Sequence, residues 1–219
     1  DNTAVGDSAL EANTTGAKNT AVGKHSLLLN TTGTLNVAVG QAAMDANTTG
    51  SQNTACGEGA LSGNTTANDN TAIGYHSLEV NTTGTQNTAV GKDALNACTT
   101  GSSNAAFGFE AGTAVTTGSD NTMIGQEAGQ DITTGANNAC LGHDAGRSNS
   151  PSGSITTGSN QICLGNNSVT DLFCKVSTIQ TSDIRDKTDI NDFTYGLSWV
   201  EKLRPVTYKW DMRSEYEDG

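Results

Sequence analysis

Asn2-Thr3-Ala4-Val5-Gly6 is the first copy of a motif that returns in variant form at a constant step of 17 residues. The later copies begin at residues 19, 36, 53, 70, 87, 104, 121 and 138, so the step is held through eight successive intervals. A fixed period of this size is typical of a solenoid, in which one supersecondary unit repeats along an axis and packs only against its neighbours. The sequence therefore predicts a rod rather than a globular domain.

The composition agrees with thin stacked coils. Only 34% of the residues are hydrophobic, and the 219 residues include 26 Gly and two Pro. The Gly residues fall at fixed phases of the repeat, as turns require, and not at random, as in a flexible linker. We therefore expect an ordered chain without one large core.

The first half of each repeat has the pattern of a short strand. The residue before the Gly is always apolar, and the residue two before it is Ala seven times and then Met123 and Cys140. Because strand side chains alternate, these two rows point to opposite faces. Since both rows are apolar, the pattern predicts a strand that is buried on both faces.

The second half of each repeat carries a small residue, then Leu, then Asn-Thr-Thr-Gly, which is typical of a turn. We expect two short strands and two turns per coil, and about ten coils. A helix is disfavoured because no apolar stripe of helical period is present. The predicted fold class is all-β, a parallel β-solenoid (β-roll) over residues 1–173.

The two apolar rows also predict self-association. If the large aliphatic row fills the interior of each coil, the Ala row forms a ridge on an outer face, and a homotrimer about the rod axis would bury that ridge. The stretches 137–142 and 160–165 resemble the head repeats of trimeric autotransporter adhesins, which form a left-handed parallel β-roll. The period here is longer than in those adhesins, so the turns must differ.

The repeat changes toward its end. Between Gly142 and Gly165 the step grows by six residues, which predicts a projecting loop at 147–152 with Pro151 in it. Such a loop is either a binding surface or a tolerated insertion. From Phe107 on, the Leu row is replaced by Gly at 112, 129 and 146, so we expect the cross-section of the rod to change there.

A second module is expected over residues 174–219, which hold seven of the 11 basic residues, both Trp and three of the four Tyr. Two blocks, 182–190 and 196–210, resemble the opening of the intramolecular chaperone domain at the C-terminus of phage tail fibres and endosialidase-type tailspikes. The segment from Tyr195 to Leu203 is predicted to be a short amphipathic helix that Arg204 and Pro205 end. The resemblance implies a small α+β cap, of which this chain holds the first part.

The resemblance also implies a chemistry. Chaperone domains of this family trimerise the chain, template the fibre, and are often released by self-cleavage at a Ser paired with a Lys. Those positions would be Ser182 and Lys187 here, with Lys187 as the base that activates the hydroxyl. Two hypotheses stay open: a self-cleaving Ser/Lys endopeptidase that acts on its own chain, and a junction that only begins a trimeric cap.

Other candidate sites are weak in the sequence. His25 and His76 share a phase but lie three coils apart, roughly 14 Å at strand spacing, and His143 stands alone. We therefore expect no metal site and no cofactor. Five Cys without paired spacing argue against a disulfide framework, although Cys140 and Cys163 should stack in neighbouring coils. The Asn-Thr-Thr sequences match the glycosylation pattern, but the turn explains them.

The formal net charge of −12 bears on the partners. Nucleic acid and anionic membranes are poor partners for such a chain, and no apolar run approaches the length of a membrane span. Because the repeat is already in phase at Asp1 and the cap is incomplete at Gly219, we expect further sequence at both ends.

Together these features predict a structural and host-recognition component of a tail fibre from a bacteriophage or phage-like injection system. We expect it to assemble in the bacterial host cytoplasm and to reside in the virion. The expected partners are two further copies, a host cell-surface glycan or protein, and other tail proteins. The alternative is the head of a bacterial trimeric surface adhesin, and a polysaccharide depolymerase or an ice-binding protein has less support. No chemistry on an external substrate is predicted.

Overall fold

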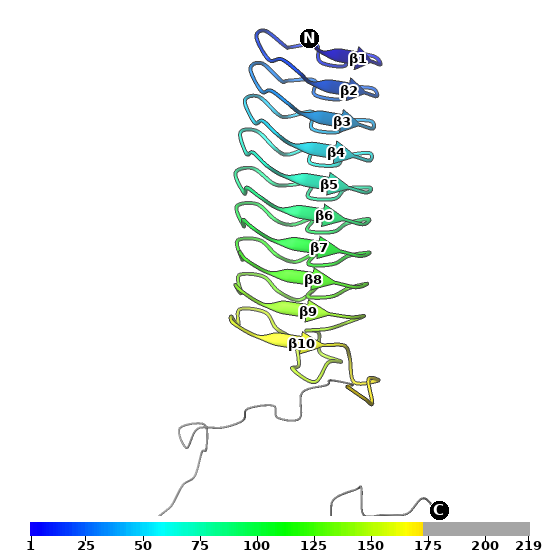
Figure 1. The fold of residues 1–219 in the computed structure, drawn as a ribbon, viewed down its shortest axis with the longest axis vertical. Helices are drawn as coiled ribbons and strands as arrows, with labels where there is room; N and C mark the ends of the chain where they lie inside the picture. The colour runs from blue at the N-terminus through cyan, green and yellow to red at the C-terminus, as the bar shows by residue number, and fades with distance from the viewer. Residues whose placement is uncertain (173–219) are drawn as a thin grey trace, which may run out of the picture. The chain divides into compact units, whose positions relative to one another are not determined.

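The computed structural model describes residues 1–172, and the secondary structure of this part consists of ten β-strands of three residues each (Figure 1). Each strand occupies the same phase of its repeat. In chain order they are β1 (Thr3–Val5), β2 (Thr20–Val22), β3 (Val37–Val39), β4 (Thr54–Cys56), β5 (Thr71–Ile73), β6 (Thr88–Val90), β7 (Ala105–Phe107), β8 (Thr122–Ile124), β9 (Ala139–Leu141) and β10 (Ile162–Leu164).

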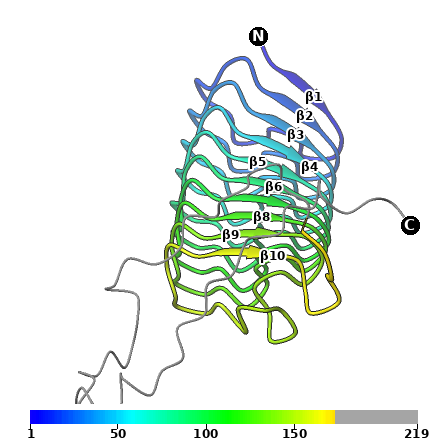
Figure 2. The ribbon, with the colours of Figure 1, turned by 60° about the horizontal axis from the view of Figure 1, so that its bottom comes forward.

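Every strand pairs in parallel with the next strand in the chain, so the sheet order follows the sequence from β1 to β10. The register places equivalent residues side by side, for example Ala55 beside Ala72. Hydrogen bonds between coils continue outside the strands, as between the Leu27 amide and the Ala43 carbonyl at 3.0 Å. Seen obliquely from the β10 end, the coils wind around a common interior (Figure 2). The predicted parallel β-solenoid with a 17-residue period is confirmed.

Each coil has one strand, so the prediction of two strands per coil is wrong. The second half of the repeat places non-glycine residues in the left-handed region at fixed phases, such as His76 (φ 51°) and Leu78 (φ 52°). A strand requires negative φ throughout, so this half folds as a chain of tight turns. The sequence held one signal of this backbone, because Gly replaces the usual residue at both positions in other coils. Gly59 is equivalent to His76, and Gly112 is equivalent to Leu78.

The two apolar rows of the strand face in the opposite sense to the prediction. From β2 on, the Ala row is buried and points into the coil, whereas the large aliphatic row is mostly exposed. The interior is narrow because Leu side chains from the opposite wall, such as Leu61 and Leu78, already fill it. Only a methyl group fits opposite them. The strand is therefore buried on one face, and the Ala row is not an outer ridge.

Two rows of Asn side chains line the interior as hydrogen-bonded ladders. In the first, Asn47 Nδ2 donates to Asn30 Oδ1 at 2.8 Å and to the Gly50 carbonyl at 3.0 Å. In the second, Asn36 Oδ1 accepts a bond of 3.0 Å from the amide of Asn53. Most of these Asn side chains are buried, and they join each coil to the next. The Asn of the Asn-Thr-Thr-Gly turn therefore belongs to the interior.

The expected change of cross-section after Phe107 is an exchange of interior volume. Gly112 replaces the Leu of earlier coils, and a Cβ there would lie 2.6 Å from Met123 Sδ. Met123 stands in the Ala row, so the strand supplies the bulk that the opposite wall has lost. Val115 and Ile132 also replace the Asn of the first ladder and are fully buried. The interior of the last coils thus stays filled, but more of its volume comes from the strand and less from the opposite wall.

The helix expected over Tyr195–Leu203 and the second module from residue 174 lie outside the described residues. Within residues 1–172, no helix has the length and apolarity that crossing a bilayer would need.

Candidate functional site

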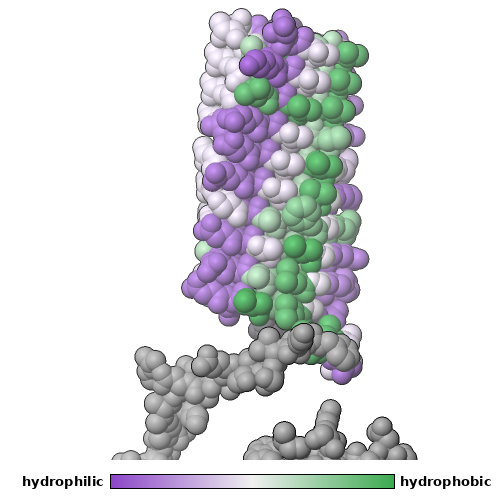
Figure 3. Space-filling model, viewed as in Figure 1, coloured by the Kyte–Doolittle hydropathy of each residue, from purple (hydrophilic) through white to green (hydrophobic). Residues whose placement is uncertain are grey.

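An uncharged face runs along the outside of all ten strands. We call it the outer stripe and define it as the first and third residues of β1–β10, whose side chains point away from the interior. The third residues are Val5, Val22, Val39, Cys56, Ile73, Val90, Phe107, Ile124, Leu141 and Leu164. The first residues are Thr3, Thr20, Val37, Thr54, Thr71, Thr88, Ala105, Thr122, Ala139 and Ile162. Hydrophobic surface follows this face along the rod in Figure 3.

The outer stripe is unusual for a sheet face in contact with water. Such a face normally carries polar side chains that alternate with the buried ones. Here large apolar side chains are left exposed, including Ile73 at 40% of its full area. An exposed apolar patch that continues along a molecule is typical of an interaction surface. The outer face therefore carries a ridge of Val, Ile, Phe and Leu in place of the Ala ridge that the sequence predicted.

Aromatic residues adjoin the middle of the outer stripe. The Lys92 ammonium group lies 5.9 Å from the ring centre of Tyr75 and 5.3 Å from that of Phe109. The Tyr75 ring also stacks on His76 with 3.8 Å between centroids, and Lys92 forms an ion pair of 3.1 Å with Asp93. These residues come from three successive coils, because equivalent phases stack along the rod. The cation–π contacts occupy one face of each ring.

The turns form a second uncharged face, which we call the threonine edge and define as the two Thr of each Asn-Thr-Thr turn. The hydroxyl of the first Thr donates a hydrogen bond to the next coil. Thr48 Oγ1, for example, donates to the Thr65 carbonyl at 2.9 Å. The second Thr, such as Thr49, is exposed. A regular array of hydroxyl groups, which an ice-binding protein would need, is thus reduced to one free row. The Asn side chains of these turns form the hydrogen bonds of the interior ladder and do not add to this face.

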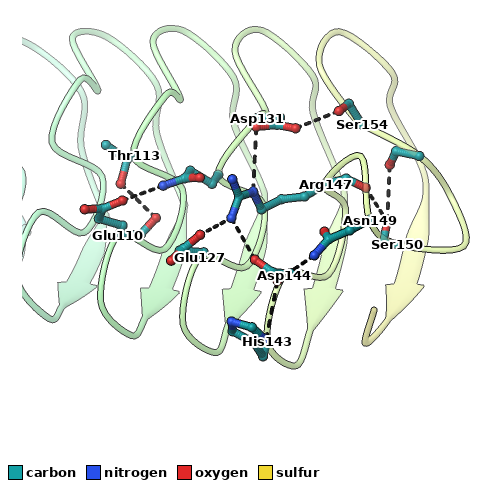
Figure 4. A network of polar contacts seen from close by, with 12 residues as sticks. Glu110, Thr113, Glu127, Asp131, His143, Asp144, Arg147, Asn149, Ser150 and Ser154 are labelled. Carbon is teal, nitrogen blue, oxygen red and sulfur yellow. Dashed lines mark hydrogen bonds and ion pairs between the residues drawn. The ribbon is translucent and has the colours of Figure 1, made fainter. Parts of the chain in front are cut away.

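A polar network surrounds Arg147 at the end of the rod (Figure 4). Its Nη1 contacts a carboxylate oxygen of Glu127 and lies 2.7 Å from Asp144 Oδ1. Its Nε lies 4.0 Å from Asp131 Oδ1. Asn149 Nδ2 donates to the other oxygen of Asp144 at 2.7 Å. Because carboxylates of successive coils stack along the rod, this one guanidinium pairs with carboxylates from two coils.

The six-residue insertion forms a loop between β9 and β10. Ser150 is buried, and its Oγ donates to the Arg147 carbonyl at 2.8 Å. Ser154 Oγ donates to Asp131 Oδ2 at 2.6 Å, which attaches the loop to the preceding coil. Pro151 and Ser152 are exposed. The loop is therefore anchored on the Arg147 network at both of its ends.

The Arg147 network also contains a cluster of possible metal ligands that the sequence analysis missed. Ligand atoms of Glu127, His143 and Asp144 lie within 4.8 Å of one another. Both carboxylates, however, already bind the Arg147 guanidinium, so this position is occupied by a cation of the chain itself. The signal was available, since Glu127 and Asp144 share one phase of the repeat and His143 directly precedes Asp144.

The four cysteines of the described residues fall in two environments. Cys140 and Cys163 are register partners on neighbouring strands and are buried, as expected, and both are free thiols. Burial raises the pKa of Cys98 to about 11 and, together with the nearby Cys163, raises the pKa of Cys140 to about 11. These two thiols are therefore protonated and unreactive at neutral pH. Cys56 is exposed on the outer stripe, so it does not pack inside the coil.

The expected catalytic pair, Ser182 and Lys187, lies outside the described residues. Its role stays a prediction.

Residues 182–219 match the family model described as chaperone of endosialidase. The matched segment is the last 38 of the 219 residues and includes both Ser182 and Lys187. No curated protein and no solved structure matches the chain. The match supports the chaperone segment expected from the sequence, and it does not include the solenoid.

Proposed function

We propose that this chain is a rod segment of a tail fibre from a bacteriophage or phage-like injection system, assembled from three parallel copies that the C-terminal segment aligns. The observation that carries the proposal is the combination of a repetitive solenoid over residues 1–172 with a chaperone match over residues 182–219. The rod holds its tip at a distance from the particle and contacts the host surface. It is built in the bacterial cytoplasm and resides in the virion.

The repeat itself explains the need for such a segment. Successive coils present nearly the same residues at the same phases, as Ala55 beside Ala72 illustrates. Two rods that shift by one coil would keep most contacts, because register is weakly specified wherever a pattern repeats. A non-repeating segment that joins three chains first would remove this ambiguity before the rods associate.

Self-cleavage belongs to the same proposal. Ser182 is the nucleophile, Lys187 is the base that takes the hydroxyl proton, and the bond that breaks is a peptide bond of the chain itself. Intact-mass measurement of the expressed chain, with and without Ser182→Ala, tests this step. We expect fragments with a boundary beside residue 182 in the unmutated chain and none in the variant. If the unmutated chain shows no such boundary, the segment is a cap without protease activity.

Assembly tests the fibre proposal more broadly. In native mass spectrometry the chain with Ser182→Ala should show a single species of three copies. A chain that ends at residue 181 should instead give a mixture of monomers and irregular aggregates. A full chain that remains monomeric would remove the fibre proposal, and identical trimers from both chains would remove the aligning role of the C-terminal segment.

The second candidate is the head of a bacterial trimeric surface adhesin, which the parallel solenoid with its Asn-rich repeats favours. An adhesin would carry a membrane anchor beyond the rod, where a tail fibre carries a chaperone domain. The full sequence of the encoding gene discriminates between the two candidates, because it shows whether a membrane anchor or a complete chaperone domain accompanies the rod. Binding to an array of bacterial surface glycans would then identify the host ligand.

A further inference from the structure

We infer that the outer stripe is the face through which three copies of the rod meet, with strands β1–β10 of each copy turned toward a common axis. The inference rests on the proposed function, which supplies the number of copies and their parallel direction. It adds the contact face, which the resemblance to known families does not give.

None of the twenty residues of the outer stripe is charged. The chain as a whole has a net charge of −12, and three copies together would carry −36. Charged residues occupy phases on either side of the stripe and on the far wall, including the carboxylates of Asp93, Glu110 and Glu127. Three acidic rods can lie side by side only if such rows point away from the contact. The outer stripe meets this condition along its whole length.

The threonine edge is also uncharged, but it lacks the apolar character. Its exposed groups are hydroxyls, which water solvates well, so burial would gain little. The outer stripe exposes Val, Ile, Phe and Leu side chains, whose removal from water is favourable at roughly 25 cal/mol per Å². Of the two uncharged faces, only the outer stripe is stabilised by a partner.

The area of the outer stripe follows from the geometry of its strands. Ten strands at ~4.8 Å spacing and three residues at ~3.3 Å give a projected face of roughly 450 Å² per copy. Three copies together would cover roughly 1,300 Å², which three pairwise contacts share, so each pair of neighbours buries roughly 450 Å² of the stripe. A contact of this size is weak by itself, which agrees with the need for a C-terminal segment that joins the three chains first.

The side chains of β7 favour one alignment of the three copies along the rod axis. Phe107 is the largest residue of the outer stripe, and Ala105 in the same strand is the smallest kind. When three parallel strands surround an axis, the third residue of one copy faces the first residue of the next copy. At equal height Phe107 would therefore pack against Ala105 of a neighbour. A shift by one coil would place it against Thr88 or Thr122, where less room is available.

Cys56 offers a direct test, because identical residues of the outer stripe approach one another around the axis. The chain with Cys174→Ser should be treated with a short bismaleimide. We expect pairs of chains joined through Cys56, each maleimide alkylating one thiolate. The matched control is the Cys56→Ser and Thr49→Cys double variant in the same background, which places the thiol on the threonine edge. We expect it to give at least tenfold less cross-linked product.

The outcomes separate this inference from the proposed function. A three-copy mass with cross-links through residue 49 and none through residue 56 would overturn the contact face and leave the trimeric fibre standing. A two-copy mass without Cys56 cross-links would indicate an antiparallel pair, in which β4 lies opposite β7, and would overturn both. A lone chain would likewise overturn both.

A charge placed on the outer stripe gives an independent test. Ile73 and Val80 belong to the same coil and are each 40% exposed, but only Ile73 lies on the outer stripe. We expect Ile73→Asp to raise the protein concentration at which the trimer dissociates at least tenfold, and Val80→Asp to leave it unchanged. The circular dichroism spectrum reports whether the solenoid remains folded. Equal trimer stability in both folded variants would overturn the inference, and if Ile73→Asp unfolds the chain, the Cys56 cross-link decides.

Discussion

Asn81 ends the first amide ladder of the interior, and its Oδ1 is the buried side-chain atom of the described residues that has no hydrogen-bond partner. Each earlier Asn of that ladder accepts a bond from the Asn one coil further on. In the next coil this position is Cys98, which has no amide to donate. Asn81 Oδ1 therefore stays unpaired because the residue that follows the Asn ladder, Cys98, has no amide group.

Two substitutions in this ladder should differ in their effect on stability. Asn47→Val leaves Asn30 Oδ1 without a donor, so it adds a second unpaired acceptor. Asn81→Val removes one unpaired acceptor and creates one at Asn64, so their number is unchanged. We expect Asn47→Val to lower the free energy of unfolding by about 1–3 kcal/mol more than Asn81→Val. Urea denaturation of the two variants measures the difference, and equal losses would contradict the ladder argument.

The buried thiol of Cys98 should make the stability depend on alkaline pH. Burial raises the pKa of this thiol in the folded chain from 9.0 to about 11. Between these values the unfolded chain releases a proton that the folded chain keeps, so stability falls as pH rises, by about 1.4 kcal/mol per pH unit. Below pH 9 the thiol has no effect on the pH dependence.

Cys98→Val removes this contribution and places at 98 the residue type found at Val115, one coil further on. We expect a shallower decline of the urea midpoint between pH 9 and pH 11 in the variant than in the unmutated chain. Parallel declines would show that the thiol titrates alike in the folded and unfolded chains.

At the level of the coil, the repeat predicted the period, the parallel stacking and the strand of each unit. The alternation of Ala and Val placed these rows on opposite faces, but it could not say which face is inside. That depends on how far the opposite wall lies from the strand, and Leu78 on that wall leaves room only for Ala72. The left-handed backbone of the turns was equally hidden, because Leu and His seldom adopt it.

The exchange of volume between Gly112 and Met123 should appear as coupling between them. Gly112→Ala places a methyl group against Met123 Sδ, whereas Met123→Ala opens a cavity. We expect the double variant to be more stable than the sum of the single losses predicts, by about 0.5–3 kcal/mol. A double-mutant cycle in urea measures this energy, and strict additivity would contradict the exchange.

Gly74→Ala is the matched control for this cycle. At φ +134° its added Cβ would lie 2.5 Å from the backbone carbonyl oxygen of Gly91 in the next coil. No side-chain substitution can relieve a clash with backbone. We therefore expect a loss of stability that Met123→Ala does not reduce.

For the whole molecule, the sequence indicated two candidate sites and missed a third. The pair Ser182 and Lys187 came from a resemblance, and the family match over residues 182–219 agrees with the segment but does not test the pair. An apolar outer face was expected, but the sequence analysis assigned it to the Ala row, which is buried because the opposite wall leaves room only for a methyl group. The Arg147 network was not foreseen, because it requires side chains from two coils and from the inserted loop to converge.

The one-dimensional order of the sheet also has a mechanical consequence. Each strand bonds only to its sequence neighbours, so tension applied to the two ends of the rod passes through every coil in series. A coil that peels away releases 17 residues, or about 58 Å of extended chain, in exchange for ~4.8 Å of rod. Single-molecule pulling should therefore record a series of equal extension steps, with one longer step for the coil that carries the six-residue insertion. The rod would absorb mechanical work by lengthening greatly before it breaks.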